Sequence, residues 1–495
     1  MRDALEQLKS RLAEAQGLST VAGFLAWDQR TMMPAGGFRH RADHLALLQR
    51  LSHSTLVDPD VGRLLDELEA RSLDPDSWDG SLVRVARREY QKAVQVPSEL
   101  RAEMARASAE ATPGWLEAKA TSNFGIFLPL MERNVELRHR YVECFGPQDE
   151  PYDVLLDDFE PEMKTADVTR IFDELKPELV ELIAELRDRE VDDSFLGGDF
   201  DLDEQVALGY EIVDLFGYRP NTWRIDPTEH PFASGAGVND IRITTHYYRD
   251  RLKSLFSTMH EYGHGLYQHQ LPAEWAHLPV GVSAGLGIHE SQSRLWENLV
   301  GRSLPFWRFY YPRVQERFPQ LKSVDVDRWY AGINKSQPSL IRIEADEVTY
   351  GMHVILRYEL ELDIINGRVE AKDLPQAWAQ KMHDYLGVEV PDDARGVLQD
   401  MHWSTGLIGY FSTYLLGSVM SVQIWEKMQD EVGDLDALLE RGEFTPLREW
   451  LGENVHAHGR KYPPQELLEK AIGSQIDAQP YIAYLKRKFG VAVAA

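Results

Sequence analysis

Residues 260–264 read His260-Glu261-Tyr262-Gly263-His264, and this H-E-x-x-H stretch is the feature around which we interpret the whole chain. Side chains four residues apart lie on one face of a helix, so both histidines can offer a ring nitrogen to one metal ion. The Glu261 carboxylate can then reach a water on the open side of that metal and accept its proton. The spacing predicts a hydrolytic metal site; the alternative is two surface histidines on an ordinary helix.

The residues around this stretch favour a helix. Apolar residues recur at steps of three and four, which makes one buried face: Leu252, Leu255, Phe256, Met259 and Leu266. Gly263 and Gly265 each cost about 1 kcal/mol of helix propensity relative to alanine. We therefore expect another element to pack closely against the helix at these glycines, and we expect the helix to end before Pro272.

A site with two histidines needs a third protein ligand. Glu290 is the first candidate, because it lies on a helix that is expected to follow a glycine-rich loop. Glu297 is the alternative, two helical turns further along the same face. The metzincin pattern would need Gly at 267 and His at 270, where this chain has Tyr267 and Gln270, so that class of site is excluded.

The composition is that of an ordinary large globular protein, with 495 residues and a formal net charge of −27. A surface so acidic repels nucleic acid and anionic membranes, and neither is an expected partner. The sequence has no apolar run of about 18 residues and no apolar signal core at its start, so no membrane span or secretory signal is expected. Cys144 is the only cysteine, expected to be a small buried side chain, and the absence of disulfides fits a cytoplasmic protein.

Most of the chain has the periodicity of amphipathic helices. Residues 1–215 read almost entirely as helix, and the pattern becomes helical again from residue 305 onward. We expect residues 340–362 to form one long helix or two joined ones, and residues 392–422 to form another. The sequence therefore predicts a mainly α fold.

Proline and glycine concentrate between about residues 217 and 250, which predicts turns rather than helix. From Asp240 to Tyr248, however, polar and apolar residues begin by alternating, which is the period of a strand. We expect this strand to be the main one of a small sheet just before the metal helix. Two interpretations stay open: the strand adds a substrate backbone as a further strand, or it is a structural ribbon with Asp240 and Arg242 paired on its surface.

Several stretches together resemble the carboxypeptidase Taq family of zinc metallocarboxypeptidases. The motifs occur in the family's order, span most of the chain and are Trp27–Pro34, His230-Pro231-Phe232, Asp240–Thr244 (D-x-R-x-T), His260–His264, His289–Gln292, Ile341–Asp346 (I-R-x-x-A-D) and Gly396–Trp403 (G-x-x-Q-D-x-H-W). The resemblance implies a large helical metallopeptidase with a deep substrate groove and a small β-sheet next to the metal helix. It implies one catalytic unit over residues 1–495, with two helical halves lining the groove and no separable accessory domain.

The resemblance also implies an activity and a set of site residues. The enzyme would remove C-terminal residues from peptides stepwise, with broad side-chain tolerance and C-terminal proline disfavoured. It would act as a homodimer with one zinc ion per chain, or cobalt in its place. The implied residues are His260, His264 and Glu290 for the metal, Glu261 and His402 for catalysis, and Arg342, His230, Asp240 and Arg242 for substrate binding.

Alternatives remain for these assignments. Arg342 could bind the terminal carboxylate in a bidentate fork, or form a structural ion pair with Glu344 or Asp346. His402 could donate to the substrate, or be a buried structural histidine beside Trp403. The competing functions are a helical zinc oligo-endopeptidase acting on short peptides and a non-enzymatic peptide-binding scaffold. The intact set of Glu261 and three ligands argues against the scaffold.

Overall fold

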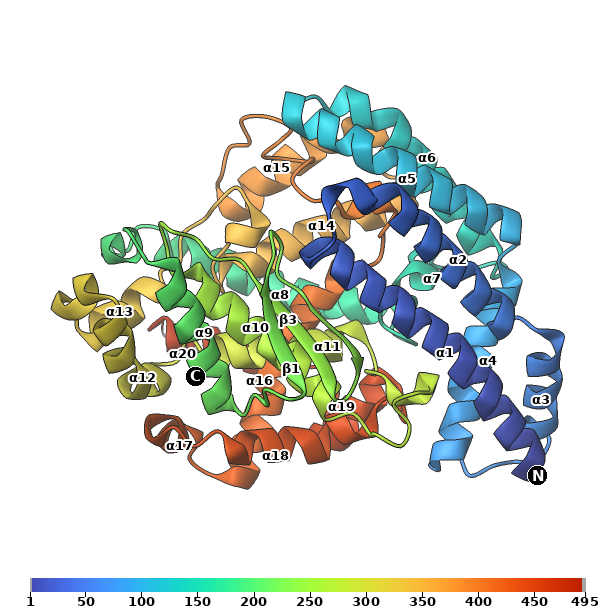
Figure 1. The fold of residues 1–495 in the computed structure, drawn as a ribbon. Helices are drawn as coiled ribbons and strands as arrows, with labels where there is room; N and C mark the ends of the chain where they lie inside the picture. The colour runs from blue at the N-terminus through green and yellow to red at the C-terminus, as the bar shows by residue number, and fades with distance from the viewer. Residues whose placement is uncertain (1, 492–495) are drawn as a thin grey trace. The chain divides into compact units, whose positions relative to one another are not determined.

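The computed structural model describes residues 2–491 and is mainly α-helical, with one three-stranded sheet, as the sequence predicts (Figure 1). The chain divides into two compact units. The first comprises the chain up to Val94, residues 192–333 and residues 423–475; the second comprises residues 95–191 and 334–422 and the chain from Ile476 onward. Within residues 2–491, no helix has the length and apolar character that a membrane crossing requires.

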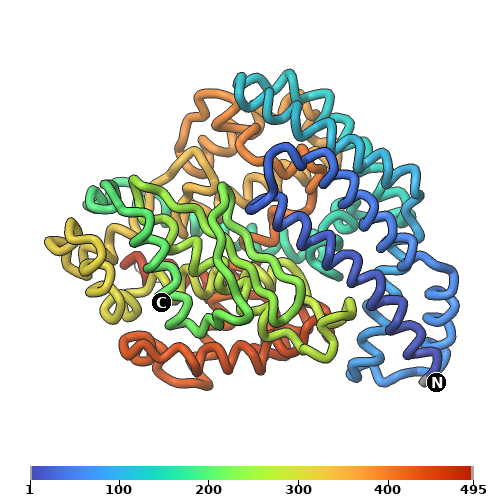
Figure 2. Tube along the Cα trace, in the orientation of Figure 1, coloured from blue at the N-terminus to red at the C-terminus, as the bar shows by residue number. Residues whose placement is uncertain are grey.

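The first unit contains the sheet and most of the short C-terminal helices. Its elements are α1 (Arg2–Thr31), α2 (Phe38–Leu56), α3 (Pro59–Glu69), α4 (Trp78–Gln95), α9 (Leu202–Phe216), β1 (Trp223–Pro227), β2 (Ala233–Gly237), β3 (Asp240–Thr245), α10 (Lys253–His269), α11 (Leu286–Arg294), α12 (Leu304–Arg317), α13 (Val326–Ile333), α17 (Leu435–Arg441), α18 (Thr445–Asn454) and α19 (Pro464–Ile472). Helices α1 and α2 run side by side in both views of the chain (Figures 1 and 2).

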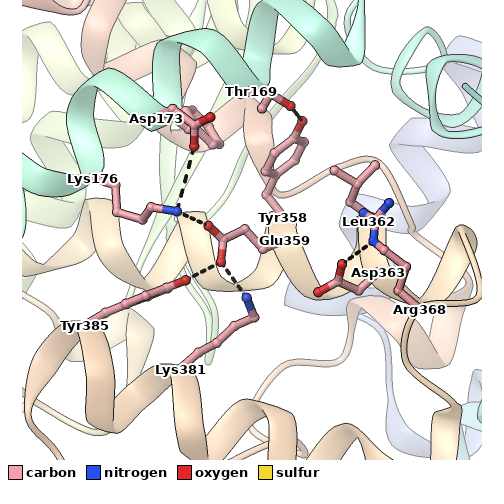
Figure 3. A pocket seen from close by; sticks show the side chains of 11 residues that line it. Thr169, Asp173, Lys176, Tyr358, Glu359, Leu362, Asp363, Arg368, Lys381 and Tyr385 are labelled. Carbon is pink, nitrogen blue, oxygen red and sulfur yellow. Dashed lines mark hydrogen bonds and ion pairs between the residues drawn. The ribbon is translucent and has the colours of Figure 1, made fainter.

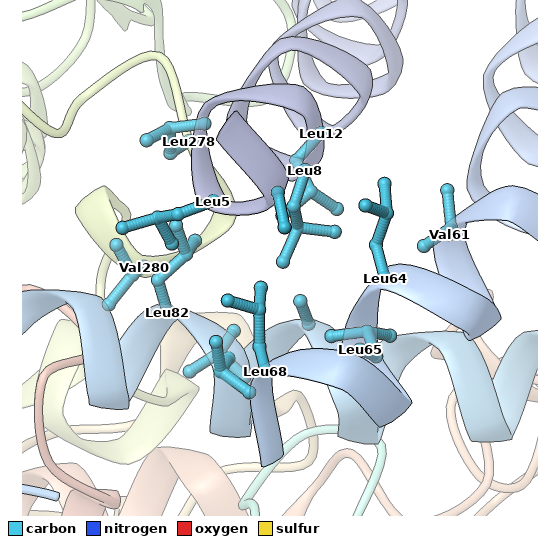
Figure 4. Close-up of a cluster of buried hydrophobic side chains, with 14 residues drawn as sticks. Leu5, Leu8, Leu12, Val61, Leu64, Leu65, Leu68, Leu82, Leu278 and Val280 are labelled. Atoms are coloured by element: carbon cyan, nitrogen blue, oxygen red, sulfur yellow. The ribbon is translucent and has the colours of Figure 1, made fainter. Parts of the chain in front are cut away.

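The start of the first unit is held by a leucine-rich core (Figure 4). Leucines at three- and four-residue steps on α1 and α3 meet side chains of α4 and of the segment after α10: Leu5, Leu8, Leu12, Leu64, Leu65, Leu68, Leu82, Leu278 and Val280. Asp58 caps α3, since its side chain accepts a hydrogen bond from the backbone N–H of Asp60 at 2.9 Å. Periodicity and cap together determine where this helix begins and which face it buries.

The sheet has the strand order β1-β3-β2, with β1 parallel and β2 antiparallel to β3. The strand predicted from alternation, β3, is therefore central and has both edges paired. It cannot accept a substrate strand, so the interpretation as a structural ribbon is the correct one. The prediction of turns alone between 217 and 250 was wrong for β1 and β2, because these short strands owe their conformation to pairing with β3 rather than to their own composition.

The second unit is all-helical. Its elements are α5 (Ser98–Thr121), α6 (Phe124–Glu143), α7 (Tyr152–Leu156), α8 (Thr165–Leu186), α14 (Thr349–Ile365), α15 (Leu374–Leu386) and α20 (Gln479–Lys488), and α16 (Ser412–Val432) begins here and continues into the first unit. Cys144, at the end of α6, is half-buried rather than buried as expected.

One carboxylate ties three helices of the second unit together (Figure 3). Glu359 of α14 accepts hydrogen bonds from Lys176 of α8 at 2.7 Å, and from Lys381 and Tyr385 of α15 at 2.6 and 2.5 Å. These side chains line a cavity of about 290 Å³. Because the carboxylate is saturated by donors, the cluster is explained as a structural ion-pair network.

The prediction of helices over residues 340–362 and 392–422 was wrong about where each helix begins, since α14 begins at Thr349 and α16 begins at Ser412. Asp346 accepts hydrogen bonds from the backbone N–H groups of Val348 and Thr349 at 2.9 and 3.1 Å, so α14 begins only at Thr349. Between α15 and α16, Gly406 and Gly409 have φ of 73° and 100°, which a helix does not permit. Both Arg342 and His402 therefore lie in short 3₁₀ turns, Arg342–Glu344 and His402–Thr405.

Candidate metal centre and substrate-binding residues

Helix α10 carries the H-E-x-x-H stretch and packs closely on both sides at its glycines. A Cβ atom at Gly263 would lie 2.4 Å from the backbone oxygen of Gln292 in α11. A Cβ atom at Gly265 would lie 2.6 Å from the indole of Trp223 in β1. The close approach that the two glycines predicted is thus confirmed: α11 lies against one side of α10 and the sheet against another.

Three side chains from α10 and α11 converge as a metal site would require. One ligand atom from each of His260, His264 and Glu290 lies within 4.8 Å of the others. The Oε2 atom of Glu290 is 3.8 Å from Nε2 of His260 and 3.4 Å from Nε2 of His264. Tetrahedral zinc, with bonds of about 2.0–2.1 Å, would separate its ligand atoms by about 3.4 Å. The donor set and its spacing therefore fit zinc.

The second nitrogen of each histidine is occupied by an acceptor. Nδ1 of His260 lies 2.9 Å from Oε2 of Glu297, and Nδ1 of His264 lies 3.1 Å from the carbonyl oxygen of His289. These contacts place the N–H on Nδ1 and leave the Nε2 lone pair of each ring available for a metal ion near Oε2 of Glu290. Glu297, the alternative third ligand in the sequence, is therefore placed to orient a ligand rather than to be one.

Electrostatics keep Glu290 ionised in spite of its burial. Burial alone would raise the pKa of this carboxyl, but Arg294 and the two histidines hold it well below its usual range. Arg294 Nε donates to the Oε1 atom of Glu290 at 2.7 Å, which leaves Oε2 facing the histidines. The carboxylate is thus presented as an anion whose Oε2 atom, which also accepts a hydrogen bond from the Ser293 hydroxyl at 3.1 Å, faces the two histidines and can bind a cation.

Glu261 is a buried carboxyl beside this cluster. Its side chain is on the helix that carries both histidines, and the residue is only 5% exposed. Its Oε2 atom has no hydrogen-bond partner within residues 2–491, and burial raises its pKa. A buried carboxylate oxygen that accepts no hydrogen bond is unfavourable, unless a molecule from outside the chain, such as water, donates to it. The position of Glu261 therefore suits a general base that takes a proton from water.

In the second unit, Arg342 belongs to a buried cluster with Asp400. Arg342 Nε and Nη2 lie 3.1 and 2.8 Å from Oδ1 of Asp400, and Arg357 Nε lies 2.7 Å from Oδ2. The ion-pair partner of Arg342 is thus Asp400 rather than Glu344 or Asp346. Two guanidinium groups share one carboxylate, so the cluster carries an excess positive charge.

His402 lies beside the same cluster in a neutral form. Burial lowers the pKa of His402 to about 4. Its Nε2 atom is 3.2 Å from the hydroxyl of Tyr414, and its Nδ1 atom has no hydrogen-bond partner in the part of the chain that the structure describes. Tyr414 follows Tyr410 by one helical turn, a spacing typical of core aromatic residues, so the sequence gives no strong reason to place it in a site.

The remaining predicted residues lie in or near the sheet. Arg242 forms an ion pair with Asp240 at 2.7 Å, and its guanidinium lies 4.5 and 4.4 Å from the rings of Phe24 and Trp27. The early Trp27 motif is therefore the stacking surface for this arginine. His230 is exposed in the bend between β1 and β2. Direct substrate contact by His230, Asp240 and Arg242 stays a prediction.

Comparison with known proteins agrees with this architecture. Residues 7–489 match the family model of carboxypeptidase Taq (M32) metallopeptidases. Thermostable carboxypeptidase 1 of Thermus thermophilus is 40% identical over 98% of both chains, and carboxypeptidase 1 of Bacillus subtilis is 36% identical over 95% of both. The crystal structure of the M32 carboxypeptidase from Deinococcus radiodurans R1 superposes with a TM-score of 0.95 at 36% identity, covering 99% of both chains. The chain therefore belongs to the carboxypeptidase Taq (M32) family and is a metallocarboxypeptidase.

Proposed function

We propose that this enzyme releases single residues from the free C-terminus of peptides, using one zinc ion per chain held by His260, His264 and Glu290. The observation that carries the proposal is the convergence of two imidazole nitrogens and one carboxylate oxygen within 4.8 Å. Imidazole and carboxylate donors also suit neighbouring divalent metals, so cobalt is expected to substitute. Elemental analysis of purified protein should give about one transition metal per chain.

The chain's own residues would then manage the protons of hydrolysis. When bound, zinc would polarise the scissile carbonyl and lower the pKa of a water toward neutrality. Glu261 accepts a proton from the water that attacks the carbonyl carbon. As the C–N bond breaks, Glu261 passes that proton to the leaving amine nitrogen, so the products are a shortened peptide and a free amino acid.

Arg342 would recognise the terminal carboxylate. Asp400 takes the edge of the guanidinium formed by Nε and Nη2, while Nη1 donates to the Tyr350 hydroxyl at 3.1 Å. Beyond these contacts one N–H group remains on Nη1 and one on Nη2, and we propose that these two form the fork that a carboxylate accepts. A substrate carboxylate would also balance the excess positive charge of this buried cluster.

We further propose broad tolerance of the C-terminal side chain and slow release of C-terminal proline. In a bond to proline the leaving nitrogen belongs to a ring with a fixed φ, which restricts how the scissile amide can be oriented. The whole chain is proposed to work as one catalytic unit, and it is proposed to form a homodimer, which light scattering would measure.

A mass ladder from one synthetic peptide tests the proposed reaction against the endopeptidase alternative. Metal-loaded enzyme should generate fragments shortened one residue at a time from the C-terminus. The Glu261→Gln variant, which keeps all three metal ligands, should bind metal but slow the ladder by a factor on the order of 10³ or more. Internal fragments appearing first, or activity of the variant within about tenfold of wild type, would contradict the proposal.

A further inference from the structure

His456 is a buried histidine that none of the sequence motifs contains. It lies in the 3₁₀ turn His456–His458 after α18 and has no solvent exposure. Its Nδ1 atom is 2.6 Å from the side-chain oxygen of Gln270, and its Nε2 atom is 2.8 Å from the side-chain oxygen of Gln292. Each ring nitrogen therefore lies within hydrogen-bond distance of a glutamine side chain more than 160 residues away in sequence, and the neutral ring donates from one nitrogen and can accept at the other.

The two glutamines belong to the elements that carry the metal ligands. Gln270 is the C-cap residue that directly follows α10, and its Nε2 atom donates to the carbonyl of Arg448 in α18 at 3.1 Å. Gln292 is fully buried in α11, two residues after Glu290. Its backbone oxygen lies against Gly263 of α10, close to the place where any other residue would have its Cβ atom. His456 thus bridges α10 and α11 close to where their backbones meet.

A row of aromatic rings connects His456 to the metal ligands. His456 stacks on Tyr267 with ring centroids 4.7 Å apart, and Tyr267 lies 5.5 Å from His289. His289 in turn stacks on His264 at 4.4 Å. Tyr267 and His264 belong to α10, and the ring of His289 from α11 lies between them. We therefore expect a shift at His456 to be transmitted to α10 by packing.

We propose that His456 is a positioning residue of the metal centre: by holding Gln292 and Gln270 it fixes α11 on α10, and so sets the distance between Glu290 and the two histidines. This inference rests on the proposed metal function of those three residues. A buried polar bridge costs desolvation that an apolar contact would avoid, which is explained if the bridge specifies one register of the two helices. Metal affinity then depends on a residue that touches no metal.

Two substitutions separate the two contacts of the ring. The amide nitrogen of glutamine corresponds to Nε2 of histidine, and that of asparagine corresponds to Nδ1. His456→Gln should keep the hold on Gln292 and retain metal affinity within about threefold. His456→Asn should lose that hold and weaken metal binding by about 10- to 100-fold. His458→Asn, at a half-buried position in the same turn, is the matched control and should change nothing.

The readouts are the metal dissociation constant from chelator competition and the thermal midpoint with and without metal. If His456 is a positioning residue, zinc should raise the thermal midpoint of His456→Asn by less than it raises that of the wild type. Gln292→Met removes the same contact from α11 and should act like His456→Asn, which tests the bridge even if that variant folds poorly. Unchanged metal affinity in both variants, with only a lower midpoint of the metal-free protein, would overturn the inference. Failure of the wild type to bind zinc would instead overturn the proposed function.

Discussion

The Glu297 carboxylate lies 2.9 Å from Nδ1 of His260, across the ring from the Nε2 atom that faces Glu290. Two glutamates thus flank one histidine from opposite sides, and the proposed function gives them different chemical roles. Residues Leu295–Val300 form a π-helical turn that continues α11, and this turn carries Glu297. Single π-helical turns inside helices are frequent at functional sites, and they change the face on which later residues lie.

The two glutamates should respond differently to removal. Glu290→Ala should lose most of the bound metal, because it deletes one of the three proposed ligands. Glu297→Ala should keep the metal with an affinity weakened by about 10- to 100-fold, because it deletes only the partner that orients His260. Elemental analysis and chelator competition measure both quantities. Full metal content in Glu290→Ala together with loss in Glu297→Ala would make Glu297 the ligand.

Gly263→Ala tests whether α10 and α11 can pack closely only because residue 263 has no side chain. The added Cβ would meet the Gln292 backbone at 2.4 Å, which forces the helices apart and should cost about 1–3 kcal/mol of stability. Metal affinity should fall with it, since Glu290 moves with α11. Gly17 is a matched control for the added methyl group, because it also lies in a helix, α1, but a Cβ atom placed there would have nothing within 4 Å. Gly17→Ala should raise stability by up to about 1 kcal/mol. Equal effects of both substitutions on denaturation midpoint and zinc affinity would contradict this account.

The sequence predicted the parts of the site whose spacing is local. The H-E-x-x-H helix, the glutamate on the next helix and the central strand each show their period over a few residues. Glycine at 263 and 265 even indicated the close packing of neighbours, because its propensity cost needs a compensating contact.

What the sequence could not predict depends on contacts between distant residues. A cap by Asp346 shortens α14, and left-handed glycines at 406 and 409 keep the segment before α16 out of a helix. Those two facts move Arg342 and His402 from predicted helices into turns. The pairing of Arg342 with Asp400 brings together segments 58 residues apart, which no local period records.

Glu361 should make stability depend on pH near neutrality. This fully buried carboxyl accepts hydrogen bonds from Tyr152, Trp403 and the backbone of Gly409 at 2.7, 2.8 and 2.9 Å. Burial raises the pKa of Glu361 from its ordinary value of 4.5 to about 7. Between these values the folded chain binds a proton at Glu361 that the unfolded chain does not. The contribution of Glu361 to the free energy of unfolding is therefore complete below about pH 4.5 and is lost as the pH rises through about 7.

Glu361→Gln isolates that contribution, because glutamine keeps the shape and does not titrate. Relative to the variant, the wild type should lose about 3 kcal/mol of stability between pH 4 and pH 8, from a pKa shift of about 2.5. Thermal midpoints of both proteins across this range measure the difference. A difference that stays constant with pH would show that Glu361 keeps one protonation state in the folded protein.

Arg342 should decide whether the enzyme recognises a free C-terminus. A carboxylate is the one charge always present at a peptide's end, and a guanidinium with two free N–H groups on one edge can hold it in a fixed orientation. Arg342→Ala should cost about 2–5 kcal/mol in kcat/KM on a peptide acid and leave metal content unchanged. Arg342→Lys should recover little, because an ammonium cannot form the fork. Arg224, which pairs with Asp226 on β1 at 2.6 Å, is the matched control, and Arg224→Ala should leave the preference for a free terminus intact. Amidation of the C-terminus should abolish trimming by wild type but change little for Arg342→Ala. If wild type cuts amidated and free peptides equally well, Arg342 is only a structural partner of Asp400.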